Sequence, residues 1–260
     1  MNKKEDSKSF YRLVSIIERL RAPGGCPWDR EQTHDSIKGN MLEEAYEAVE
    51  TIDKGDMDKL REELGDLLLQ IVLHAQMAKD EGSFEIGDVI QGICDKLIYR
   101  HPHVFGEAKV KDSADVVANW EQLKRKEGKG ELLSGLPKNM PALAYAQAMA
   151  RRVARVGFDW KDADDIIDKL SEEIAELRHA EDHSHKIMEF GDTLFTLVCA
   201  ARRMDIDAEA ALRARNERFY KRFSYMEKDC AERGRLLADM TLEEQNALWD
   251  EAKLALGDTA

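Results

Sequence analysis

Closely spaced acidic residues are the groups in this sequence with the clearest capacity for chemistry. Glu176 follows Glu172 by four positions and Glu173 by three, and Asp192 follows Glu189 by three. On α-helices these spacings place the carboxylates of each block on one flank. The residues after Asp192 are apolar around most of a helix circumference, so that helix is expected to be largely buried. Buried acids are costly unless a cation neutralises them, and clustered carboxylate oxygens predict a site for Mg²⁺, with Mn²⁺ as the alternative.

The same arrangement occurs a second time, nearer the N-terminus. Glu43, Glu44 and Glu47 form the first acidic block of this copy, and Glu63 and Asp66 lead into another apolar helix. The two blocks are separated by 15 residues here and by 12 in the other copy. A solvated acidic face explains most single E-x-x-E patterns. Because the spacing and the apolar context both recur, two metal sites are the stronger interpretation.

Helical periodicity runs through nearly the whole chain and supplies the elements that position the acids. No segment calls for a strand, so we expect an all-α fold. The predicted helices of the first half cover residues 10–21, 41–52, 57–79, 84–99 and 116–126. A loop over 26–34 is expected to lead to a helix start near Asp35 or Ser36.

The order of these elements returns after a linker at 128–141 that is rich in Gly and Pro. This duplication predicts two helical modules, residues 1–127 and 142–260, with cores like four-helix bundles. A helix with acids on one strip and apolar residues on its other sides needs more partners than one module supplies. We therefore expect a homodimer to complete the bundles.

Composition narrows the class of protein. The chain of 260 residues carries a net charge of −13 with no basic block, which argues against stable binding to nucleic acid or to a membrane surface. No apolar run approaches the length of a membrane span, and no N-terminal signal segment is evident. The four cysteines have no zinc-binding spacing, so we expect a cytoplasmic protein with free thiols. The absence of G-x-G-x-x-G, Walker A and G-x-S-x-G motifs excludes the common nucleotide-binding folds and serine hydrolases.

Together with the tandem acidic blocks, three further motifs resemble the MazG family of nucleoside triphosphate pyrophosphohydrolases. They are GCPWD at 25–29, RHPHVF at 100–105 and VGFDW at 156–160, and the likeness covers residues 10–255. The resemblance implies an all-α pyrophosphatase fold completed by dimerisation. It also implies Mg²⁺-dependent cleavage of nucleoside triphosphates, over a broad range of bases, to the monophosphate and pyrophosphate.

The resemblance further implies roles for individual residues. Metal held by carboxylates neutralises phosphate oxygens, one carboxylate can orient or deprotonate the attacking water, and lysine and arginine donate to phosphate. The implied catalytic and metal-binding residues are Glu172, Glu173, Glu176, Glu189 and Asp192, and the implied substrate contacts are Lys169, Asn216, Lys221, Arg222, Trp249 and Lys253. The implied metal ligands of the second, weaker site are Glu43, Glu44, Glu47, Glu63 and Asp66.

Two functional alternatives stay open on the residues alone. One is a non-catalytic helical bundle whose acids bind Mg²⁺ or a protein partner, and the other is a phosphatase that releases orthophosphate from nucleoside triphosphates.

Glu176 and His179 also form an E-x-x-H step, which is half of a ferritin-like di-iron site. Because the partner helix carries E-x-x-D instead, His179, His183 and His185 are interpreted as polar residues of the connection between helices.

The second module is expected to carry most of the catalysis. The first module has Asn40 at the position that Lys169 takes in the second. Its site should therefore offer less positive charge to a triphosphate, with Arg100 and Lys124 as partial compensation. One lost charge-assisted contact typically weakens binding by about tenfold or more, which predicts a weaker first site.

Overall fold

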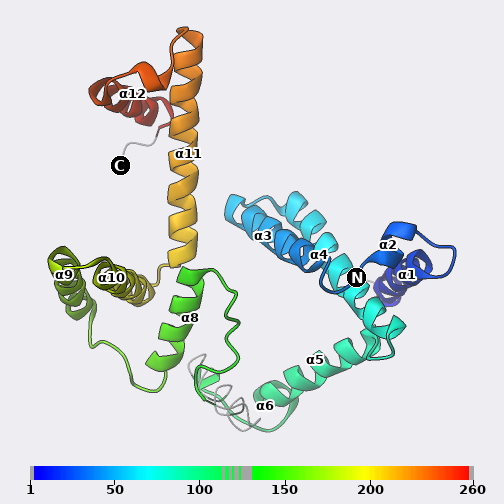
Figure 1. Ribbon diagram of the computed structural model, residues 1–260. Helices are drawn as coiled ribbons and strands as arrows, with labels where there is room; N and C mark the ends of the chain where they lie inside the picture. Colours follow the sequence, from blue (N-terminus) through cyan, green and yellow to red (C-terminus); the bar gives the residue numbers. More distant parts are fainter. Residues whose placement is uncertain (1–2, 113–114, 117–118, 120–122, 124–130, 258–260) are drawn as a thin grey trace. The chain divides into compact units, whose positions relative to one another are not determined.

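The computed structural model describes residues 3–112, 115–116, 119, 123 and 131–257, with side chains from residue 8 onward. Every regular element in this part of the chain is helical, which confirms the expected all-α fold. The chain divides into two compact units, residues 1–127 and 128–260 (Figure 1). Each unit is described by itself below.

The first unit is built around one long helix, α4. Its elements are α1 (Lys3–Arg21), α2 (Pro27–Glu31), α3 (Lys38–Lys54), α4 (Met57–Asp80), α5 (Ile86–Arg100) and α6 (Pro102–Phe105). Helix α4 packs against α1, α3 and α5. The turn between α3 and α4 is set by Gly55, whose φ of 69° suits glycine, and by Asp56, whose side chain accepts a hydrogen bond from the Lys59 backbone N–H.

Two details of the first unit differ from the sequence-based expectations. The expected loop over 26–34 contains the short helix α2, because Pro27 stands at a first-turn position where its fixed φ favours a helix. Helix α3 begins at Lys38, after a turn in which the Ser36 hydroxyl donates to Gln32. The helix predicted over 116–126, with Trp120 and Lys124, falls mostly outside the described residues.

The second unit repeats the plan around α10. Its elements are α8 (Ala142–Ala154), α9 (Ala163–His179), α10 (His183–Arg203), α11 (Ala208–Glu232), the 3₁₀ helix η1 (Leu237–Asp239) and α12 (Leu242–Ala255). Helix α10 packs against α8, α9 and α11, with aspartate N-caps at Asp162, Asp182 and Asp207 on α9, α10 and α11. Helix α12 packs on the C-terminal half of α11, where Met226, Cys230, Leu248 and Ala252 form a small core.

The apolar helix after Asp192 is only half covered, which corrects the expectation that it would be largely buried. Val198, Cys199 and Ala200 are buried, whereas Phe190 and Leu197 are 55% and 51% exposed. Helices α8, α9 and α11 cover one side of α10, and no described element of this unit covers the other. Helix α4 likewise exposes Leu64, Leu68 and Ile71. Apolar faces of this kind on a folded chain mark interaction surfaces.

No helix in the described part of the chain is both long enough and apolar enough to cross a membrane.

Candidate metal centres and the substrate residues

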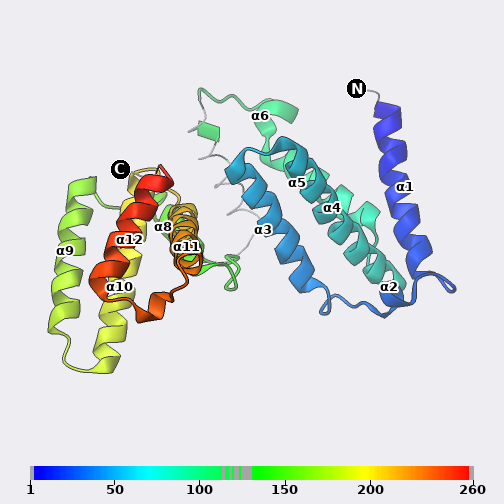
Figure 2. The same cartoon turned by 90° about the horizontal axis from the view of Figure 1, so that it is seen from above.

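The acids of the second unit converge where α9 and α10 lie side by side (Figure 2). Carboxylate oxygens of Glu173, Glu176 and Glu189 all lie within 4.8 Å of one another. Glu173 and Glu189 are buried, and Glu176 is exposed. Helical periodicity aligns the acids within each helix, and the short connection at 180–182 brings the second helix back alongside the first.

A lysine and a histidine side chain contact these acids. Lys169 Nζ lies 2.9 Å from Oε1 of Glu172 and 2.9 Å from Oε1 of Glu173, and hydrogen bonds to these carboxylates raise the pKa of Lys169. His185 Nε2 lies 2.9 Å from Glu189 Oε1. The interpretation of His185 as a residue of the connection is therefore wrong, since it lies inside α10. His185 and Glu189 are four residues apart, and this i,i+4 spacing in the sequence could have indicated that the two side chains would pair on one helix.

Glu172 and Asp192 lie outside this group of three. Glu172 is exposed and pairs with Lys169, and Asp192 is exposed on α10. The structure thus brings together three of the five predicted ligands within one chain.

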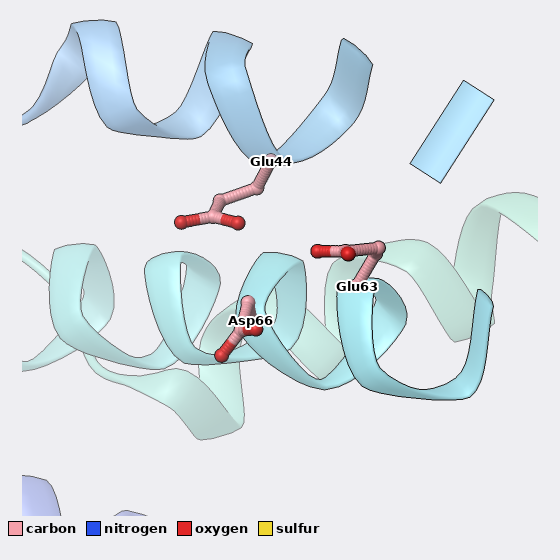
Figure 3. Close-up of side chains that lie close together, drawn as sticks. All are labelled: Glu44, Glu63 and Asp66. Atoms are coloured by element: carbon pink, nitrogen blue, oxygen red, sulfur yellow. The ribbon is translucent and has the colours of Figure 1, made fainter. Parts of the chain in front are cut away.

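The acids of the first unit meet in the same way between α3 and α4. Figure 3 shows Glu44 on α3 facing Glu63 and Asp66 on α4, and oxygens of the three carboxylates lie within 4.8 Å of one another. Burial raises the pKa of Glu44, and the negative charges of Asp66, Glu63 and Glu43 raise it further. These acids therefore repel one another in the absence of a cation.

Glu47 also belongs to this neighbourhood, while Glu43 is exposed at its edge. A hydrogen bond with Glu63, together with the negative charge there, raises the pKa of Glu47. Lys59 Nζ lies 2.9 Å from Glu63 Oε1, at the position that His185 takes in the second unit. Asn40 stands where the second unit has Lys169, but α4 contributes Lys59, a cation that the comparison of the two sequence blocks did not include.

Both groups fit a hard divalent cation. The donors are carboxylate oxygens alone, drawn from two helices, and Mg²⁺ and Mn²⁺ prefer such ligands. Among the described residues, neither group of candidate ligands includes a histidine or a cysteine. His179 is not part of the group formed by Glu173, Glu176 and Glu189, and its Nδ1 lies 2.7 Å from the Ala175 carbonyl oxygen of its own helix.

The predicted substrate residues form a second group at a distance from the acids. Trp249 lies against the Phe219 ring, with centroids 5.2 Å apart, and the Arg222 guanidinium lies 5.5 Å from the Trp249 ring centroid. Lys221 pairs with Glu217 and Lys253 with Asp250. Figure 1 shows α12 at the opposite end of α11 from α9 and α10. Of the predicted contacts, the structure therefore brings only Lys169 to the acids within one chain, while Asn216 is exposed on α11.

Comparison with known proteins identifies the family. Residues 32–105 match the MazG nucleotide pyrophosphohydrolase domain. The chain is 42% identical over 253 residues to the nucleoside triphosphate pyrophosphohydrolase/pyrophosphatase MazG of Thermotoga maritima, covering 96% of this chain and 98% of that protein. The chain belongs to the MazG family of nucleotide pyrophosphohydrolases.

Two other relatives of this MazG chain are similar over most of its length. The nucleoside triphosphate pyrophosphohydrolase of Escherichia coli K12 is 42% identical over 252 residues, which cover 93% of this chain and 96% of that protein. An uncharacterized Bacillus subtilis protein, YabN, is 50% identical over 251 residues, 94% of this chain but 51% of the longer relative. The resemblance seen in the tandem acidic blocks is thereby confirmed.

Proposed function

We propose that the chain is a Mg²⁺-dependent hydrolase that cleaves nucleoside triphosphates of several bases to the monophosphate and pyrophosphate. The observation that carries this is the group of Glu173, Glu176 and Glu189 with Lys169 beside it. Names of the relatives point to the same substrate class, and the oxygen-only ligand sets suit Mg²⁺, with Mn²⁺ as an alternative.

The repeat supports a ligand set of four positions in each unit. In the first unit Asp66 belongs to the group, whereas its counterpart Asp192 in the second unit does not. In the second unit Glu176 belongs to the group, whereas its counterpart Glu47 in the first unit does not. Equivalent positions of a duplicated site are expected to share one role. We therefore propose Glu173, Glu176, Glu189 and Asp192 as the main ligands, with Glu172 at the rim, and Glu44, Glu47, Glu63 and Asp66, with Glu43 at the rim, in the first unit.

The charge and position of each residue suggest its role in metal binding, phosphate contact or orientation of the attacking water. Bound Mg²⁺ would supply charge neutralisation for the phosphate oxygens. Lys169, held by Glu172 and Glu173, would donate to a phosphate once the substrate displaces one of these carboxylates. A carboxylate that is not occupied as a ligand would orient the attacking water in line with the pyrophosphate leaving group.

We also propose that a second copy of the chain completes the site. Lys221, Arg222, Trp249 and Lys253 lie on α11 and α12, away from the acids of their own chain. Their cationic side chains would complement the acids of α9 and α10, whose apolar residues are exposed. A homodimer would cover these faces and bring the cationic residues of one copy to the acids of the other.

Product analysis tests the activity. Each of the four ribonucleoside triphosphates is incubated with the chain and Mg²⁺, and the products are separated. Monophosphate plus pyrophosphate is expected; diphosphate plus orthophosphate would identify a phosphatase, and no turnover would favour a non-catalytic bundle. Glu173→Ala should abolish the reaction. Glu181→Ala, at an exposed acid outside the group, is the matched control.

Complementation tests the shared site. Glu173→Ala and Arg222→Ala chains are each expected to be nearly inactive, because each homodimer has two damaged sites. Co-expressed chains would form mixed dimers in which one site has both residues intact, so activity should return. Failure to regain activity in a preparation shown to contain mixed dimers would place both residues in one chain's site.

A further inference from the structure

The two buried acids of the second unit each have a hydrogen-bond donor one helical turn before them. Glu173 and Glu189 are the buried members of the candidate metal group. Lys169 Nζ lies 2.9 Å from Glu173 Oε1 on α9, and His185 Nε2 lies 2.9 Å from Glu189 Oε1 on α10. Both pairs have the i,i+4 spacing that brings side chains together on one face of a helix. Lys169 has a proposed phosphate contact, whereas the proposed function assigns no role to His185.

His185 is held in place at the start of α10. The Asp182 side chain, at the N-cap, accepts a hydrogen bond of 2.8 Å from the His185 backbone N–H. This contact fixes the backbone from which the imidazole reaches Glu189. The His185 side chain is 45% exposed, whereas that of Glu189 is 9% exposed. The pair therefore joins a solvent-facing histidine to a buried acid.

The chemistry of the pair makes His185 the donor. An ionised carboxylate only accepts hydrogen bonds, and an imidazole with a proton on Nε2 donates from that nitrogen in both its neutral and its cationic form. The hydrogen bond engages Oε1 of Glu189 and leaves the lone pairs of its Oε2 for a cation. His185 can therefore fix this carboxylate without removing it from the group formed with Glu173 and Glu176.

The first unit keeps a donor at the equivalent position but changes its type. Lys59 precedes Glu63 by four residues on α4, and its Nζ lies 2.9 Å from Glu63 Oε1. Glu63 and Glu189 are equivalent, because each begins the E-x-x-D step of its unit. The two units thus share a hydrogen bond donated to a buried acid of the group, and not a particular side chain. A contact that recurs while the residue type changes indicates that the contact itself has a role.

Outer hydrogen bonds of this kind are a general feature of metal sites. They orient a ligand before the ion arrives, and their removal typically weakens metal binding or activity by about 10–100-fold. Without such a bond, Glu189 can adopt several rotamers, and repulsion from Glu173 and Glu176 favours those that turn away from the group. A hydrogen bond from His185 opposes this repulsion.

We propose that His185 is a positioning residue of the second unit, which donates from Nε2 to Glu189 and keeps this carboxylate directed at the cation site shared with Glu173 and Glu176. The inference rests on the proposed function, because the ion is the one assigned there to the acids of α9 and α10. It gives a role to a residue that is neither a metal ligand nor a substrate contact. Its effect is on metal affinity, which can be measured without nucleotide.

The test measures Mn²⁺ binding to the nucleotide-free, full-length chain by electron paramagnetic resonance, which detects the free ion. Glu44→Ala is present throughout to weaken the first site, so that binding reports on the second. His185→Leu and His185→Ala both remove the donor; the first keeps much of the side-chain bulk, and the second adds no exposed apolar surface. Each should raise the dissociation constant for Mn²⁺ by about tenfold or more.

Rescue and a matched control separate positioning from a general effect on folding. His185→Gln retains an N–H donor, so its Mn²⁺ affinity should stay within about threefold of the parent. His183→Leu is the control, because His183 is also exposed in the first turn of α10 but, two residues earlier, lies on a different face from Glu189. This variant should bind Mn²⁺ as the parent does. All variants are first checked for the helical content of the parent.

Steady-state assays provide a second readout that a purely structural role would not change. His185→Leu should need about tenfold more Mg²⁺ for its half-maximal rate, while kcat at saturating Mg²⁺ stays within about threefold of the parent. A loss of kcat with an unchanged Mg²⁺ requirement would contradict the positioning role.

The outcomes distinguish this inference from the proposed function. Parent-like Mn²⁺ affinity in both variants without the donor would overturn it, and so would a His185→Gln chain that binds Mn²⁺ as weakly as His185→Leu. Lowered stability with parent-like affinity would show that the pair only stabilises α10. In each of these cases, hydrolysis of triphosphates by the intact chain would leave the proposed function standing. Absence of both hydrolysis and Mn²⁺ binding in the parent would refute that function and this inference together.

Discussion

Replacing Glu44 with glutamine should stabilise the metal-free first unit while removing its response to metal. Glu44, Glu63 and Asp66 hold carboxylate oxygens within 4.8 Å of one another, and no described cation pairs with Glu44 (Figure 3). Glutamine keeps the size of the side chain and removes its charge. The variant therefore isolates the electrostatic cost of holding three acids together.

The size of the effect follows from Coulomb's law and from protonation. Two unit charges 4.8 Å apart repel by about 0.9 kcal/mol in water and about 3.5 kcal/mol at an effective dielectric constant of 20. Glu44 faces two such charges, so the repulsion screened as in water is about 1.7 kcal/mol before any offset by a cation. Glu44 can also escape the repulsion by taking up a proton. At pH 7 this costs a carboxyl of ordinary pKa 4.5 about 3.4 kcal/mol, so the repulsion cannot destabilise the fold by more than that. Lys59 offsets part of the Glu63 charge. We therefore expect Glu44→Gln to raise the free energy of unfolding by about 1.5–2 kcal/mol, near the value for screening by water.

Urea unfolding at pH 7 measures this difference. In EDTA, Glu44→Gln should raise the free energy of unfolding of the first unit, and the melting temperature should rise by several degrees. In millimolar Mg²⁺ or Mn²⁺ the parent chain should gain stability and the variant should gain much less. Glu50→Gln, at an exposed acid paired with Lys54 on the same helix, should change neither measurement appreciably. A less stable Glu44→Gln chain in EDTA would refute the reasoning.

Three further predictions concern the two sites and the contact between His34 and His74. Glu173→Ala should abolish pyrophosphate release while Glu44→Ala leaves it near normal; the reverse result would assign catalysis to the first unit. Lys169→Met should lower kcat/KM by about tenfold or more in steady-state assays, through loss of a charge-assisted phosphate contact, and unchanged kinetics would exclude that contact. Because burial and the neighbouring His34 lower the pKa of His74 in the folded chain, the unfolded chain binds more protons, and stability should fall as pH drops below about 6.5. His74→Gln should flatten the unfolding free energy between pH 6.5 and 5, and a curve parallel to that of the parent would contradict this.

The sequence alone determined the helical plan and the acids that could meet. Steps of three and four residues place carboxylates on one flank of a helix, and this follows from the local geometry of the backbone. The repeat at Glu44 and Glu173, each followed by an E-x-x-D helix, predicted both candidate sites, and the structure brings three acids together at each. Residues that cap and turn helices are also local, so the bounds of α4 and α5 could be predicted within two residues.

Tertiary structure alone decided which charges pair and which faces stay open. Lys169 pairs with Glu172 and Glu173, His185 pairs with Glu189, and Lys59 pairs with Glu63. Side-chain rotamers and the neighbouring helix select these partners among several that the sequence allows. Periodicity shows an apolar surface on α10, but not how many helices one chain provides to cover it. The contact between His34 and His74 joins residues 40 positions apart, and only packing of the loop before α3 against α4 could bring them together.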